Sequence, residues 1–153
     1  MAERGRELPS KVMAAALRFL KVRPRSRFEV QNKLERGGFS AGEIEKTIQV
    51  LEEKKLVDDA RFARWWAEDR ALAGKYGPLR VRAELEEKGI AQSMMDGVLA
   101  EIYTGDRQRE ILKGLAAKGR EEDLSKLAAK LQRAGFDEEA VEGALLLRQE
   151  QAS

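Results

Sequence analysis

The sequence predicts an all-α protein, built as an elongated tandem array of three three-helix repeats. A short motif that ends in glycine and an apolar residue occurs three times, beginning at Leu34, Leu85 and Leu131. The spacings are 51 residues (34 to 85) and 46 residues (85 to 131). No segment alternates apolar and polar residues in the manner of a half-buried strand. Repeats of about this length usually stack, because one unit cannot bury its own apolar face.

The repeats share further apolar positions at the same spacings. These positions are Val30, Val81 and Leu127 before the motif, and Ile44, Met95, Val141, Ile48, Leu99 and Leu145 after it. We therefore expect a flexible N-terminal segment at residues 1–10 and repeats at 11–57, 58–105 and 106–150, the last being the weakest match.

The first helix is predicted by an apolar stripe. Met13, Leu17 and Leu20 are spaced so that they share one helical face. Pro24 should end this helix at about Arg23, because the residue before a proline avoids the helical conformation.

Two serine–glutamate pairs mark the next two helix starts. Ser26 with Glu29, and Ser40 with Glu43, each fit a capping box, in which the hydroxyl and the carboxylate satisfy free amides reciprocally. The glycines of Gly37–Gly38 lie between them and favour a left-handed helix end.

The second repeat is predicted to open with a cap at Asp58 or Asp59, followed by an apolar series and a new helix at Gly77 and Pro78. That series is Phe62, Trp65, Trp66 and Leu72. Adjacent tryptophans point about 100° apart on a helix, so we expect one in the core. The other lies either at a junction between repeats or exposed to a partner.

Composition narrows the chemistry. The chain has no Cys and no His, which removes disulfides, thiolate catalysis and the commonest general base. Asp58 and Asp59 look like an acidic pair, but their place before an apolar helix favours caps over a metal site. We expect no metal, no cofactor and no enzymatic activity. No apolar run reaches membrane-spanning length, which predicts a cytoplasmic protein.

Charge alternates in blocks along the chain. The net charge is +6 over residues 1–36, −3 over 37–60, +2 over 61–90, −3 over 91–106, +4 over 107–133 and −4 over 134–153. Each repeat thus opens basic and closes with an acidic third helix. Stacked repeats would present a basic edge suited to phosphates and an acidic edge suited to a basic protein groove.

Candidate binding residues follow from these blocks. The basic edge comprises Arg18, Lys21, Arg23, Arg25 and Arg27, with a second cluster at Lys75, Arg80 and Arg82. The partner-binding acidic edge comprises Glu43, Glu45 and Glu52. The basic clusters are either a solvated surface or a contact for DNA or a filament. Tyr76 either stacks on a base or packs at a junction between repeats.

Three segments in order resemble the RecX family of recombination regulators: Arg23–Leu34, Leu56–Ala63 and Gly74–Ile90. The pattern Gly74-x-x-Gly77-Pro78, followed by Lys88-Gly89-Ile90, is the most specific part, and the match spans roughly residues 14–150. The resemblance implies a modular helical protein that binds RecA recombinase filaments on DNA and suppresses their growth and activity.

The partners implied are a RecA-type filament and single- or double-stranded DNA, bound without sequence preference by a monomer. The alternative is a sequence-independent DNA-binding module without a specific protein partner. The acidic third helices separate the two hypotheses, because a pure DNA binder gains nothing from them.

The predicted elongation is testable by small-angle X-ray scattering. A compact globule of this length should have a radius of gyration of about 15 Å. A stacked array of triplets should give a clearly larger value and an extended distance distribution. A compact value with a spherical profile would contradict the array.

Overall fold

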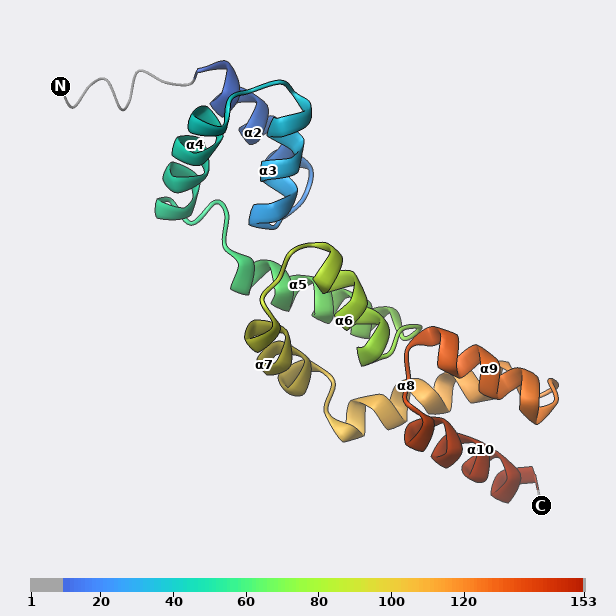
Figure 1. Cartoon of the computed structure of the whole chain (residues 1–153). Helices are drawn as coiled ribbons and strands as arrows, with labels where there is room; N and C mark the ends of the chain where they lie inside the picture. The colour runs from blue at the N-terminus through green and yellow to red at the C-terminus, as the bar shows by residue number, and fades with distance from the viewer. Residues whose placement is uncertain (1–9, 153) are drawn as a thin grey trace. The chain divides into compact units, whose positions relative to one another are not determined.

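The computed structural model describes residues 10–152. Within that range the chain forms nine helices and no strand (Figure 1), which confirms the all-α prediction. The helices are α2 (Lys11–Val22), α3 (Arg27–Arg36), α4 (Ala41–Glu53), α5 (Asp59–Ala73), α6 (Pro78–Glu87), α7 (Gln92–Ile102), α8 (Gly105–Lys118), α9 (Leu124–Ala134) and α10 (Glu138–Ala152). None of these helices is long and apolar enough to cross a membrane.

The chain divides into two compact units. Unit 1 runs to Phe62 and also includes Lys88–Ile90, and unit 2 comprises Ala63–Glu87 with the chain from Ala91 onward. The division falls inside α5 rather than between two triplets.

Unit 1 is built on a triplet in which α2, α3 and α4 all pack against one another (Figure 1). Its buried core consists of Val12, Ala16, Val30, Leu34, Ile44, Ile48, Leu51 and Val57. The prediction for the α2 face is wrong at Leu17, which is 41% exposed. Val12 and Ala16 face the core instead, because small side chains let this helix pack closely on the other two.

The predicted helix ends of unit 1 are confirmed. The Ser26 hydroxyl accepts from the Glu29 amide (3.2 Å), and the Glu29 carboxylate accepts from the Ser26 amide (3.0 Å). Ser40 and Glu43 form the same box. Helix α2 ends at Val22, just before Pro24. The predicted flexible segment, except for Ser10, which caps α2, lies outside the described residues.

Unit 2 repeats the predicted core positions. Val81 and Leu85 on α6, and Leu127 and Leu131 on α9, are fully buried, as Val30 and Leu34 are in unit 1. Helix α7 buries Met95, Val98, Leu99 and Ile102, and α8 buries Ile111, Leu112 and Leu115. The repeat pattern therefore marks real core positions in all three triplets.

The core face of α5 follows the prediction at Phe62, which is buried, and differs from it further along the helix. Ala63, Ala67 and Ala71 are buried, whereas Leu72 is 72% exposed. Neither tryptophan is fully buried, so the expectation of one core tryptophan is wrong. A helix that packs through alanines approaches its neighbours closely and leaves bulky rings at its flank.

One close junction in unit 2 brings two chain segments into backbone contact. The Gly77 amide donates to the Ala134 carbonyl (2.7 Å), and the Leu79 amide donates to the Gly135 carbonyl (2.9 Å). A Cβ atom at Gly77 would lie 2.4 Å from the Gly135 carbonyl oxygen. Both glycines are required here, because Gly135 also has a φ of +107°.

Unit 1 contains the equivalent junction. The Ser26 hydroxyl donates to the Lys88 carbonyl at 2.7 Å. Gly89 has a φ of +76°, and a Cβ atom there would lie 2.5 Å from the Cβ atom of Phe28. Ser26 and Gly77 differ by 51 residues, and Gly89 and Gly135 by 46, so the junctions obey the repeat spacing. In both junctions, the turn before the second helix of one triplet packs on the glycine that follows the second helix of the next triplet.

We predict that Gly135→Ala destabilises the protein by on the order of 1–3 kcal/mol, because the added methyl group clashes at a left-handed position. Gly97→Ala is the matched control, since Gly97 lies inside α7 with no atom near the new methyl group. That control should gain about 0.5–1 kcal/mol from reduced backbone entropy. Urea unfolding followed by circular dichroism measures both, and equal midpoints for the two variants would refute the junction argument.

Candidate interaction surface

Two cations of the predicted basic edge lie on the outside of α2. Arg18 and Lys21 are exposed, and no ion pair joins either of them to another residue in the range 10–152. Leu17 and Val22 flank them and are 41% and 77% exposed. The outer face of α2 therefore combines positive charge with accessible apolar surface.

The next two arginines are used to shape the turn after α2. Arg23 forms a bidentate pair with Glu29, with Nη2 at 2.6 Å from Oε2. Arg25 stacks on the Phe19 ring at 3.8 Å and donates Nε–H to the Phe19 carbonyl at 3.1 Å. Burial lowers the pKa of Arg25, and the nearby Arg23 charge adds to the effect.

Glu29 is the central acceptor of this turn. Its carboxylate accepts from Arg23, from the Ser26 amide and from Lys88 (3.2 Å), and its side chain is only 12% exposed. Burial alone would raise the pKa of Glu29, but these donors outweigh burial and lower it. The carboxylate therefore holds the turn and the Lys88 segment together.

Arg27 corrects the expectation of two separate charged edges. Its guanidinium bonds to Glu52 at 2.7 Å and to Glu45 at 3.0 Å. A residue expected on the basic edge thus pairs with two residues expected on the acidic edge. The pairing joins the start of α3 to α4. The paired residues are far apart in the sequence, so the block charges could not predict this contact.

The acidic third helices are partly neutralised in the same way. Glu43 accepts from the Ser40 amide and hydroxyl, both at 3.1 Å. In unit 2, Asp96 on α7 accepts from Arg82 at 2.5 Å, and Glu101 accepts from Arg64. All three predicted acidic-edge residues therefore bond within the protein, and Arg82 does as well.

The turn between α5 and α6 is more open. Lys75 and Arg80 are exposed there, and the Arg80 guanidinium lies 4.8 Å from the centre of the Tyr76 ring. Arg70 lies 5.0 Å from the same ring, and the Tyr103 hydroxyl donates to the Tyr76 carbonyl (2.8 Å). Tyr76 thus packs among groups of its own repeat, and neither base stacking nor packing between repeats is tested by these contacts.

Lys75 and Arg80 line a cavity that sequence reasoning missed. Its volume is about 330 Å³, and its lining is Lys75, Arg80, Leu115, Lys118, Lys130, Arg133 and Ala134. Three of its five cations come from α8 and α9, in the +4 block over residues 107–133. The block charge was visible in the sequence, but the convergence of these side chains depends on the glycine junction.

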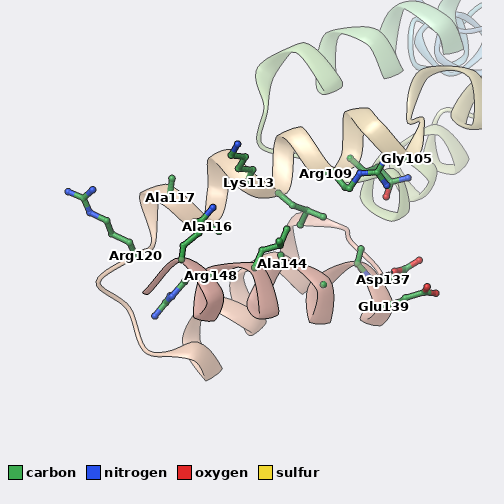
Figure 2. Close-up of a pocket in the computed structure, with 16 residues that line it drawn as sticks. Gly105, Arg109, Lys113, Ala116, Ala117, Arg120, Asp137, Glu139, Ala144 and Arg148 are labelled. Atoms are coloured by element: carbon green, nitrogen blue, oxygen red, sulfur yellow. Dashed lines mark hydrogen bonds between the residues drawn. The ribbon is translucent and has the colours of Figure 1, made fainter. Parts of the chain in front are cut away.

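A larger groove, of about 790 Å³, is lined mainly by residues of α8 and α10, which pack against each other. Figure 2 shows its lining. Ala116, Ala117 and Ala144 form part of its wall, with Arg120 and Arg148 at one end and Asp137 and Glu139 at the other. Arg148 donates to the Gly119 and Glu122 carbonyls and so closes the turn between α8 and α9.

Asp58 and Asp59 act as backbone acceptors. Asp58 accepts from the Arg61 amide (3.1 Å), which is a cap, and Asp59 accepts from the Arg27 amide (2.8 Å). Asp59 thus ties the start of α5 to α3 within unit 1. Within the described range, no three His, Cys, Asp or Glu side chains gather as metal ligands.

Comparison with known proteins gives a consistent family. Residues 13–51 match the RecX first three-helix domain, and residues 58–99 match the RecX second three-helix domain. The regulatory protein RecX of Halorhodospira halophila is 34% identical over 87% of this chain and 85% of its own length. That of Chlorobium limicola is 33% identical over 81% and 80%, respectively.

A solved structure shares the fold. The crystal structure of RecX from Lactobacillus salivarius superposes with a TM-score of 0.76 over 91% of this chain and 95% of that chain, at 21% identity. The chain therefore shares the fold of this solved structure.

We predict that Glu29→Gln lowers stability at neutral pH by about 1–3 kcal/mol, because charged hydrogen bonds at a buried carboxylate are lost. The folded-state pKa of Glu29 lies below its ordinary value of 4.5, so this contribution is present above 4.5 and is lost as the pH falls further. The difference between wild type and variant should shrink in acid.

Urea unfolding at neutral pH and in acid well below 4.5 measures this difference. Glu53→Gln, at an exposed position on α4, is the control and should change little at either pH. A pH-independent effect of Glu29→Gln would contradict the role given to the carboxylate charge.

Proposed function

We infer the function from one premise: the chain belongs to the RecX family of regulatory proteins. We propose that it binds RecA-type recombinase filaments on DNA and inhibits their assembly, ATP hydrolysis and strand exchange. The observation that carries the proposal is the family relationship itself, which extends over most of the chain and keeps both three-helix domains in order.

The outer face of α2 supports a contact that includes protein as well as DNA. Arg18 and Lys21 are suited to phosphates, whereas Val22 and Leu17 expose apolar area beside them. Apolar area contributes little to a phosphate backbone contact, but it is the usual centre of a protein interface. A filament groove presents DNA and protein together, so both kinds of contact engage at once and raise the effective concentration.

The structure of unit 1 changes which residues are useful probes. Glu45 and Glu52 pair with Arg27, and Glu43 belongs to a capping box, so changes there alter the fold as well as any interface. Arg18 and Lys21 have no ion pair in the range 10–152, and their replacement leaves the core contacts of α2 in place.

We predict that the wild-type protein lowers the DNA-dependent ATPase of a RecA-type recombinase. Arg18→Ala combined with Lys21→Ala should raise the half-inhibitory concentration several-fold. Lys46→Ala combined with Lys54→Ala is the control, because it removes equal charge from two exposed positions, one on α4 and one at its C-cap. Equal inhibition by wild type and both variants would sink the assignment of this face.

A further variant separates the proposal from the alternative, a DNA-binding module without a protein partner. Val22→Ser should weaken co-sedimentation with preformed filaments while leaving binding to naked DNA unchanged. Under the alternative, the protein would sediment with DNA alone as strongly as with filaments, and Val22→Ser would have no effect on either.

A further inference from the structure

We propose that unit 2 carries a phosphate-binding site, the five-cation pocket, and that it holds a phosphodiester of the DNA backbone. The pocket is formed by Lys75, Arg80, Lys118, Lys130 and Arg133. This inference deepens the proposed function and rests on it for the choice of DNA as the ligand. It gives the third repeat a role in binding.

The fold brings these cations together through three elements. Lys75 lies in the turn before α6, and Arg80 lies in the first turn of α6. Lys118 is the last residue of α8, and Lys130 and Arg133 lie on α9. The backbone bonds of Gly77 and Leu79 to Ala134 and Gly135 fix the turn against the end of α9. These backbone hydrogen bonds bring the start of α6, with Arg80, against the end of α9, with Arg133.

Few carboxylates compensate this charge. Glu84 lies 3.6 Å from Arg80, and Glu122 lies 3.3 Å from Lys130. Lys75, Lys118 and Arg133 are exposed and have no ion pair within residues 10–152. Three uncompensated cations around one small cavity repel one another, and an anion placed among them removes that cost.

The repeat register shows what is unusual about this pocket. Arg80 is equivalent to Glu29, since both precede the first core residue of a second helix by one position, with Val81 equivalent to Val30. In unit 1, Glu29 collects Arg23 and Lys88 at the junction. In unit 2 a cation takes that place, and Gly74 and Ala134 stand where unit 1 has Arg23 and Lys88, so the charge at this junction comes from the cations that line the pocket.

The dimensions and chemistry favour a phosphodiester. A volume of about 330 Å³ is near the lower end of ligand sites, which suits a phosphate with part of its sugar. Arginine and lysine together supply the forked and point donors that phosphate oxygens accept. Leu115 and Ala134 line the pocket as well and offer apolar contact to sugar carbons.

The test measures binding of a fluorescent oligothymidine by anisotropy across a salt series, without recombinase. Lys118→Gln combined with Arg133→Gln removes two of the uncompensated cations. Lys113→Gln combined with Lys126→Gln is the control, since it removes equal charge from exposed positions on the same two helices. Circular dichroism checks that all variants remain helical.

We expect the pocket variant to flatten the log–log salt dependence by about 0.7 per lost phosphate contact on single strands. The control should leave the slope close to that of wild type. Equal flattening by both variants would show a diffuse electrostatic field instead of a site and would overturn the proposal. An unchanged slope in the pocket variant, with loss of sedimentation on phosphatidylglycerol vesicles, would assign the pocket to lipid and overturn it too.

The outcome of this experiment is independent of the test of the proposed function. DNA binding is measured here on naked oligonucleotide, whereas the variants on α2 are scored by inhibition of a recombinase. Loss of the salt slope with normal inhibition would support the pocket alone. Normal oligonucleotide binding with loss of inhibition by the Arg18 and Lys21 variant would support the proposed function alone.

Discussion

The backbone contact between a turn and a glycine is the constraint on which the other features depend. In unit 2 the Gly77 amide reaches the Ala134 carbonyl at 2.7 Å, and in unit 1 the Ser26 hydroxyl reaches the Lys88 carbonyl at the same distance. No side chain fits between the two segments at either place. Short helices bury little surface each, so such fixed contacts decide how chain segments pack within each unit.

Sequence reasoning succeeded where structure is set locally. The capping boxes at Ser26 and Ser40 and the helix end before Pro24 involve residues within one turn of each other, so spacing alone specifies them. Sequence reasoning failed where tertiary packing determines which face of a helix is buried. Leu17 is the larger side chain, but Ala16 is the one that lets α2 approach its neighbours. Helix periodicity reports how often apolar residues recur, not which of two adjacent stripes is buried.

The charge pattern was only partly informative for a related reason. Block charges counted Arg27 as basic and Glu45 and Glu52 as acidic, but crossing helices bring these groups together. Exposed cations without an ion pair in the range 10–152 include Arg18 and Lys21 on α2, and Lys75, Lys118 and Arg133 at the five-cation pocket. A pocket of this kind needs no apolar register, which explains how the faintest repeat contributes Lys118, Lys130 and Arg133.

The junction occurs twice, and its two copies carry different charged residues. The copy in unit 1 satisfies its own charges through Glu29, and it is therefore a structural joint that an anion has no reason to enter. The copy in unit 2 is held by backbone hydrogen bonds and places Arg80 at the position of Glu29, so a positive charge stands where unit 1 has a negative one. In unit 2 backbone hydrogen bonds hold the joint, so side chains around it can change without removing those bonds. A repeat protein can in this way convert a joint into a binding site by exchanging the charged residues around it.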